Sequence, residues 1–252
     1  MSFIAAVRFL TSIPLPGRHE MTAEQMGRGT AYFPVVGLII GLILVALYWL
    51  LGMILPPAIV AALLVAAMVL LSGAMHLDGF ADTCDGIGGH KPVEERWKVM
   101  RDSRTGAFGV VGVVVLLLVK YVTLSAIPDT FMAATLLFVP AAGRWAMVYA
   151  IFAFRYARPS GLGTAFKQAT RWPQFVAATI ITVAVALALF PFFSLAGLLV
   201  IGGVWVVITG FAFYLKYKFA GLTGDTYGAI DEPAEVLALL FFMVIYNHVT
   251  LI

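Results

Sequence analysis

Long apolar stretches alternate with short polar connections along almost the whole chain. Each stretch has about 18–24 residues, enough at 1.5 Å rise per residue to cross a hydrocarbon core of about 30 Å. Pro56, Pro57 and Pro128 fall between stretches, where helix breakers belong. The pattern predicts an all-α, polytopic helical membrane protein with about seven transmembrane helices in a single integral membrane domain, residues 1–252. The stretches are 33–55, 58–75, 107–127, 131–154, 174–193, 195–215 and 234–252.

The segment 2–13 is apolar but too short to cross a bilayer. Phe3, Val7 and Leu10 recur in it at helical spacing. This spacing predicts a short N-terminal helix that lies in the membrane interface.

The basic residues are unevenly distributed over the connections. Fourteen of the sixteen Lys and Arg residues fall on alternate connections, and Lys120 and Arg144 lie inside predicted spans. The positive-inside rule places those connections and the N-terminus in the cytoplasm and the C-terminus outside. Twelve of the thirteen acids share that side, so we expect the active-site loops there, over about 76–109, 155–173 and 216–235.

Composition supports the membrane interpretation and excludes other classes. Hydrophobic residues make up 62% of the chain and charged residues 12%, against roughly 45–50% and 25% in soluble domains. These values exclude disorder, a coiled coil and a nucleic-acid-binding module. The net charge of +3 suits the cytoplasmic loops of a protein whose partner is membrane lipid.

A run of acids directly follows the second apolar stretch. Asp78, Asp82 and Asp85 fall within a 60° arc if that helix continues, because successive residues are 100° apart. Three carboxylates on one face repel one another unless a cation neutralises them. Hard oxygen ligands suit Mg²⁺ or Mn²⁺, so we expect all three to bind metal and Asp82 and Asp85 to act in catalysis. A solvated, turn-forming loop is the alternative.

Two arginines follow about twenty residues later. Arg101 and Arg104 offer planar groups that match phosphate oxygens, with Asp102 between them. We expect both to bind phosphate and Arg104 also to stabilise charge in the reaction. Ordinary membrane anchoring by cations is the alternative, and it would apply equally to Arg96 and Lys98.

Two further polar patches fall on the same predicted side. Arg155, Arg158 and Gly161 form a weaker candidate for binding a second anionic group. Asp225 stands between glycines in a predicted tight loop, and we expect it to act as a metal ligand or general base. Glu235 follows near the start of the last span. It either serves function or stabilises the helix N-terminus through its negative charge.

Three other residues have weaker patterns. On an ideal helix His76 points away from the Asp stripe, so a hydrogen bond is as good an interpretation as metal ligation. Cys84 lies among acids that disfavour a thiolate, which argues against a nucleophile, and as the single cysteine it has no disulfide partner. Arg144 is charged inside a span, and it either serves function or neutralises an acid across the bundle.

Several of these motifs together resemble the adenosylcobinamide-GDP ribazoletransferases, the cobalamin synthases. They occur in the family's order and cover nearly the whole chain. The acidic block and the arginine block together make the resemblance specific. The matching segments are 8–16 (RFLTSIPLP), 76–86 (HLDGFADTCDG), 101–106 (RDSRTG), 161–163 (GLG) and 224–228 (GDTYG).

The resemblance implies an Mg²⁺-dependent transferase of the inner membrane. Its substrates would be adenosylcobinamide-GDP and α-ribazole or its 5′-phosphate, and its products adenosylcobalamin or its phosphate, plus GMP. Such chemistry needs charge neutralisation more than a covalent nucleophile. Association with other enzymes of the cobalamin pathway, and homo-oligomer formation, stay open.

Three other functions are weighed against this one. Another membrane phosphotransferase, acting on a nucleotide-diphosphate-activated alcohol, is the main alternative, although the acidic block lacks the spacing of the CDP-alcohol phosphotransferases. A transporter would place its acids deep in several spans, whereas these lie in connections. A membrane scaffold would leave the Asp stripe without a role.

Overall fold

The computed structural model describes residues 2–14, 22–158, 162–189 and 196–249. These residues contain no β-strand, which confirms the all-α prediction. The elements are α1 (Ser2–Leu10), α2 (Ala23–Gly29), η1 (Thr30–Tyr32), α3 (Phe33–Gly52), α4 (Pro57–Leu71), α5 (Met75–Ile87), α6 (Val93–Val99), α7 (Ala107–Ser125), α8 (Asp129–Ala153), α9 (Leu162–Ala169), α10 (Trp172–Ala188), α12 (Ala196–Phe219) and α13 (Gly224–Val249).

Each of the seven apolar stretches corresponds to one long helix: α3, α4, α7, α8, α10, α12 and α13. The predicted ends at residues 193, 195 and 252 lie outside the described residues. The largest difference concerns α13, which begins at Gly224 although its apolar stretch begins at 234. Its first ten residues include three acids but are helical, and those acids have partners on α5, on α7 and in the connection 154–158.

Fewer spans are supported than the seven that the pattern predicts. Four described helices are long and apolar enough to cross a membrane: Glu24–Gly52, Ala107–Ser125, Asp129–Ala153 and Gly197–Phe219. Two bent pairs, α4 with α5 and α9 with α10, raise the number to six if each pair is one span. The central helix α13 is not among them, and its N-terminal half carries four acids. The chain is a polytopic helical membrane protein.

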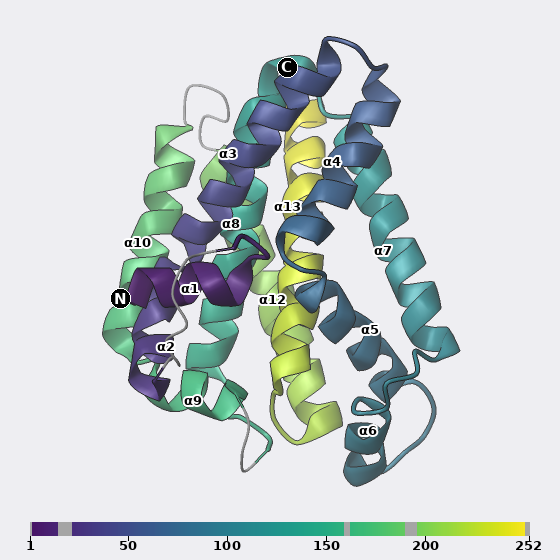
Figure 1. The fold of residues 1–252 in the computed structure, drawn as a ribbon, viewed down its shortest axis with the longest axis vertical. Helices are drawn as coiled ribbons and strands as arrows, with labels where there is room; N and C mark the ends of the chain where they lie inside the picture. Colours follow the sequence, from purple (N-terminus) through teal and green to yellow (C-terminus); the bar gives the residue numbers. More distant parts are fainter. Residues whose placement is uncertain (1, 15–21, 159–161, 190–195, 250–252) are drawn as a thin grey trace.

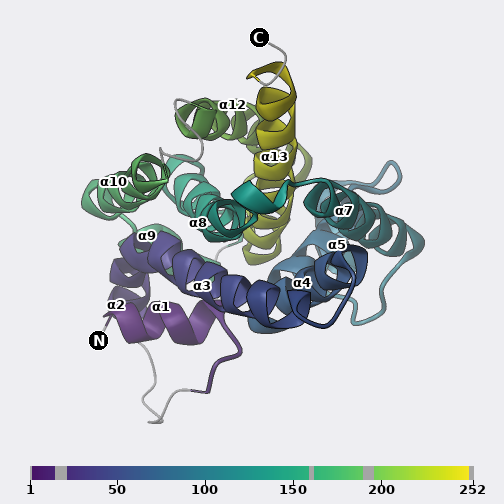
Figure 2. The same ribbon diagram turned by 90° about the horizontal axis from the view of Figure 1, so that it is seen from above.

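The helices surround two central members. Seen from above, α3, α4, α7, α12 and α10 lie around α8 and the first part of α13, whose C-terminal part extends to the edge of the bundle (Figure 2). In an apolar 18-residue segment of α8, 78% of the segment is buried, whereas the corresponding segments of α7 and α12 are 28% buried. Glycines allow the closest approach, because a Cβ at Gly37 or Gly41 of α3 would lie 2.4 or 2.6 Å from a backbone oxygen of α8.

The bundle has one polar end, which we define as α2, α5, α6, α9 and the connections 88–92, 100–106, 154–158 and 220–223. These elements lie in the lower part of Figure 1. The short helix α1 lies across the long helices, in the orientation expected of an interfacial helix (Figure 1). The acids predicted to continue span 2 form a separate helix, because the chain bends by 88° between α4 and α5. Helix α5 therefore belongs to the polar end.

Candidate active site

The bend before α5 brings the acidic run against α13. Gly73 and Ala74 have φ of 62° and 58°, a left-handed turn that ends α4. Beyond it α5 crosses α13 closely, because a Cβ at Gly79 would lie 2.6 Å from the carbonyl oxygen of Asp225. A Cβ at Gly228 of α13 would likewise lie 2.9 Å from the backbone of His76. The crossing places the Asp stripe of α5 beside Asp225.

The three acids of α5 have different environments. Asp78 is exposed and Asp82 is half-buried. Asp85 is buried, and its carboxylate accepts hydrogen bonds from the backbone N–H groups of Gly106 (2.7 Å) and Gly109 (2.8 Å). Asp85 therefore satisfies free N–H groups at the start of α7, where a negative charge is also favoured by the helix dipole.

Asp82 lies in a region of excess negative charge. Burial raises its pKa to about 7, and the charges of Asp78, Asp225 and Asp85 contribute, opposed by Arg158. Burial also raises the pKa of Asp225, although Arg158 lowers it. Oxygen donors with an uncompensated charge fit Mg²⁺ chemically. Among the described residues, no three His, Cys, Asp or Glu side chains are already gathered as a metal site.

Asp225 is held by an ion pair from a distant connection. Its Oδ2 lies 3.1 Å from Nη2 of Arg158. Backbone hydrogen bonds fix the segment before Arg158: the N–H of Ala157 donates to Leu222 O (2.7 Å), and that of Leu222 donates to Arg155 O (2.9 Å). These hydrogen bonds join the connections before α9 and α13, a link that no sequence pattern predicted.

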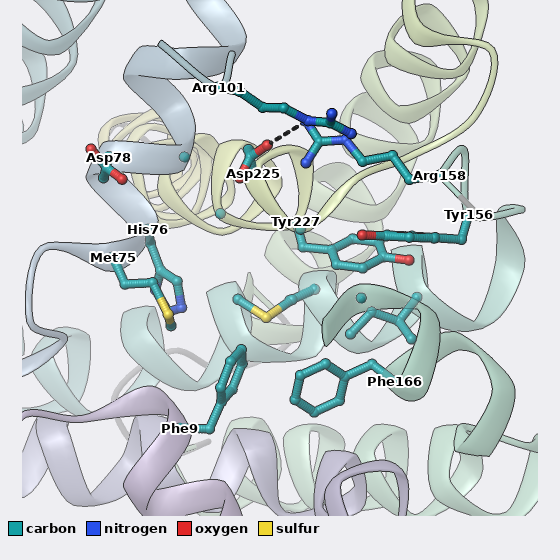
Figure 3. A pocket seen from close by; sticks show the side chains of 16 residues that line it. Phe9, Met75, His76, Asp78, Arg101, Tyr156, Arg158, Phe166, Asp225 and Tyr227 are labelled. Carbon is teal, nitrogen blue, oxygen red and sulfur yellow. Dashed lines mark hydrogen bonds and ion pairs between the residues drawn. The ribbon is translucent and has the colours of Figure 1, made fainter. Parts of the chain in front are cut away.

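These residues surround the mouth of a cavity of about 320 Å³. We define the polar mouth as Asp78, Arg101, Arg158 and Asp225, which line the cavity together. Figure 3 shows Arg101 and Arg158 extending toward Asp225 from opposite sides. The inner part of the cavity is formed by aromatic and sulfur-containing side chains, including Phe9, Met147 and Phe166.

The remaining predicted site residues lie elsewhere. Arg104 pairs with Asp102 (2.8 Å), its side chain is 86% exposed, and it does not line the cavity. That pairing lowers the pKa of Asp102 to about 2. Arg155 is exposed and donates from Nε to Ala220 O (3.2 Å). Gly161 lies outside the described residues. The thiol of Cys84 has a pKa raised to about 11 by burial and by Asp85, consistent with its rejection as a nucleophile.

A second charged group lies inside the bundle, and the sequence predicted only that Arg144 could neutralise an acid there. Lys120 contacts Glu232 and Glu235, both at 2.7 Å. Arg144 contacts Glu235 and, at 3.3 Å, Asp231. Arg144 therefore neutralises acids across the bundle, one of the two roles predicted for it. We define the buried ion cluster as His76, Lys120, Arg144, Asp231, Glu232 and Glu235, all at most 3% exposed.

His76 joins the cluster to the cavity. Its Nδ1 lies 2.9 Å from Oδ2 of Asp231, and the residue also lines the cavity. His76 was predicted either to form a hydrogen bond or to bind metal, and the structure shows it in a polar contact within the chain. The sequence signal for the buried ion cluster was the presence of Lys120 and Arg144 inside apolar stretches, where an isolated charge is costly.

The motifs and their geometry can now be compared with known proteins. A family model described as cobalamin-5-phosphate synthase matches residues 2–243. The chain belongs to this family. The synthase family is one of enzymes with a role in cobalamin synthesis, which confirms the resemblance seen in the motifs.

Relatives named adenosylcobinamide-GDP ribazoletransferase match this synthase over nearly its full length. One from Roseiflexus sp. is 39% identical over 93% of the chain and 86% of the relative. One from Geotalea daltonii is 38% identical over 96% and 97%, respectively. One from Pseudomonas putida is 38% identical over 95% and 97%. No solved structure matches the chain significantly.

Proposed function

We propose that this synthase joins adenosylcobinamide-GDP to α-ribazole or α-ribazole 5′-phosphate in an Mg²⁺-dependent reaction. The products are adenosylcobalamin or its 5′-phosphate, and GMP. The observation that supports this most is the gathering of Asp78 and Asp225 with Arg101 and Arg158 at one cavity mouth. Asp82 lies close enough for the charges of Asp78 and Asp225 to raise its pKa. Carboxylates for a divalent cation and arginines for phosphate oxygens are the groups that phosphoryl transfer requires.

In the reaction, a hydroxyl oxygen of the riboside attacks the phosphorus atom that is attached to cobinamide. A new P–O bond forms, the P–O bond to GMP breaks, and the hydroxyl proton passes to a base. Arg101 and Arg158 bind the diphosphate oxygens and stabilise the charge that moves to the departing GMP. Asp225, oriented by Arg158, receives the proton.

Asp78 and Asp82 are the residues that would hold Mg²⁺, with Asp225 as a third candidate. When bound, the ion supplies neutralisation of the diphosphate charge. Asp85 already accepts two backbone hydrogen bonds, so its role in this proposal is to hold the start of α7 beside the acids. Its remaining lone pairs leave it available as a further ligand.

We further propose a location in the bacterial inner membrane, with the polar end in the cytoplasm. Lys and Arg residues concentrate on the connections of that end. The nucleotide substrate carries a charged diphosphate, which does not cross a bilayer, so it would reach the polar mouth from the cytoplasm.

Product formation tests the proposal directly. Purified protein in lipid nanodiscs is incubated with adenosylcobinamide-GDP, α-ribazole and Mg²⁺, and the corrinoid product and GMP are quantified by chromatography. Equal amounts of both products, absent with EDTA, are expected. The 5′-phosphate, tested in parallel, identifies the preferred substrate. Folded, Mg²⁺-binding protein that makes neither product would overturn the proposal, and a CDP-activated alcohol would be tested next.

A further inference from the structure

The cavity behind the polar mouth changes character with depth. Its charged residues lie at the opening, whereas Phe9 and Phe166 lie at the far side from Arg101 and Arg158 (Figure 3). Met147 and Ile151 of α8 complete the inner wall and are almost fully buried. We call the region lined by Phe9, Met147, Ile151, Tyr156, Phe166 and Tyr227 the aromatic chamber.

We propose that the aromatic chamber binds the flat base of the riboside substrate, and that the corrinoid lies outside the polar mouth. This inference rests on the proposed function. A volume of about 320 Å³ is at the lower end of the range of roughly 300–1,000 Å³ for small-molecule sites. It suits a nucleoside, whereas a corrin ring with its side chains and GDP is several times larger.

The walls of the chamber have the chemistry that a planar heterocycle requires. Its rings come from α1, the connection before α9, α9 itself and α13. The ring centroids of Phe9 and Phe166 are 4.5 Å apart, and those of Tyr156 and Tyr227 are 6.2 Å apart. Packing against Phe33, at 5.9 Å from Phe166, fixes the inner wall. Rigid aromatic faces bind bases by stacking and tolerate different base structures.

An unpartnered hydroxyl provides an independent indication of a ligand. Tyr227 is only 4% exposed, lines the cavity, and its Oη has no hydrogen-bond partner among the described residues. A buried hydroxyl without a partner is costly, and a ligand acceptor would remove that cost. We assign this hydroxyl as a hydrogen-bond donor to the bound riboside.

A glycine in the first turn of α9 also contributes to the chamber. A Cβ at Gly163 would lie 2.2 Å from the ring of Tyr156. Any larger residue would therefore push that ring out of its position beside Tyr227. The sequence motif 161–163 thus has a steric role at Gly163, in shaping the chamber, besides the phosphate contact predicted for Gly161.

Direct binding tests the chamber without catalysis. Titration calorimetry with α-ribazole alone, in the absence of any corrinoid, is performed on wild-type protein in nanodiscs and on Tyr227→Phe. Losing the hydrogen bond is expected to weaken binding about fivefold to tenfold. The matched control is Tyr217→Phe, because Tyr217 is 81% exposed on α12 and should leave binding unchanged. Ribose, which lacks the base, should not compete.

Steady-state kinetics separate the chamber from the proposed reaction. Tyr227→Phe and Phe166→Ala should raise the KM for α-ribazole and leave the KM for adenosylcobinamide-GDP unchanged. If the wild type makes cobalamin but these variants change only the corrinoid KM, or neither KM, the chamber assignment is wrong and the reaction stands. If the wild type makes no cobalamin but binds α-ribazole through Tyr227, the reaction is wrong and the chamber stands. Because Tyr227→Phe is nearly isosteric, it decides the question even if Phe166→Ala misfolds.

Discussion

The buried ion cluster and the polar mouth both contain acids of α13, but the carboxylates of the two regions differ in their ion-pair partners. In the cluster, Lys120 and Arg144 together contact each of its three carboxylates, which are Asp231, Glu232 and Glu235. At the mouth, Asp225 has Arg158, whereas neither Asp78 nor Asp82 has an ion-pair partner in the described part of the chain. Every carboxylate of the cluster therefore has an ion-pair partner without a ligand, whereas Asp78 and Asp82 have none within the described residues, and a bound cation would supply one.

The comparison separates structural acids from functional ones. Burying charged groups is tolerated when each is paired, and removing one partner is strongly destabilising. The charge of an unpaired, half-buried acid lowers the stability of the ligand-free protein. Removing such an acid should therefore weaken ligand binding rather than destabilise the fold. Variants in the two regions should therefore differ in which measurement they change.

The largest effect is expected in the cluster. Lys120→Met leaves Glu232 and Glu235 buried without their cation, which should destabilise the protein by about 3–5 kcal/mol. Thermal unfolding in nanodiscs measures this. Lys98→Met, at an exposed position of α6, is the control. Adding Glu232→Gln to Lys120→Met should recover part of the loss. Unfolding of Lys120→Met at the temperature of Lys98→Met would show that the cluster is not structural.

At the mouth, Asp82→Asn should lower turnover by at least about 100-fold, since changes to residues that only support a metal ligand already cost 10–100-fold. Its melting temperature without metal should not fall. Burial raises the pKa of Asp82 from 3.8 to about 7, so this carboxyl costs stability as the pH rises between those values, and Asn removes that cost. Glu94→Gln on α6 is the control. Retained turnover in Asp82→Asn would contradict the metal assignment.

The two arginines of the 101–106 motif should differ in importance. Arg101 lines the cavity, so Arg101→Ala should lower kcat/KM by about 10- to 100-fold, the value of a charged hydrogen bond to phosphate. Arg104 is exposed and paired with Asp102, so Arg104→Ala should change kcat/KM less than about threefold. Equal losses in the two variants would show that Arg104 turns toward the substrate.

The smallest effect is a dependence of Mg²⁺ binding on pH. The pKa of Asp82 is about 7, so below that pH the metal must displace a proton. Between pH 7 and pH 6, affinity should fall by up to about tenfold, with little gain above pH 8. Calorimetric titration with Mg²⁺ measures this. Asp82→Asn should lose the dependence, and a wild-type affinity that is flat over this range would exclude Asp82 as a ligand.

Much of the architecture could be predicted because its signals are local. The apolar stretches predicted all seven long helices, and the 100° periodicity correctly placed Asp78, Asp82 and Asp85 on one helix. Their different roles were not predictable in this way. Asp85 contacts Gly106 and Gly109, which are 21 and 24 residues away, so its function depends on how α7 starts beside α5.

Local sequence patterns also could not show which arginine lies beside Asp225. Arg104 and Arg158 have equally suitable chemistry, and the sequence favoured Arg104. The hydrogen-bonded connections 154–158 and 220–223 bring Arg158 to Asp225, whereas Arg104 folds back on its neighbour Asp102. Pairing over 67 residues depends on tertiary packing that no local pattern encodes.

Hydropathy, helical periodicity and motif order alone determined the helical membrane architecture, the acidic block and the family, because each is a property of adjacent residues or of a helix by itself. Packing decided the rest. The orientations of α5, α7, α8 and α13 about their axes place Lys120 beside acids 112 and 115 residues away. They leave Asp82 without an ion-pair partner among the described residues. They also enclosed an aromatic chamber between helices that are remote in sequence. Charge balance is a sum over neighbours in space, so only the folded bundle separates a structural acid from a functional one.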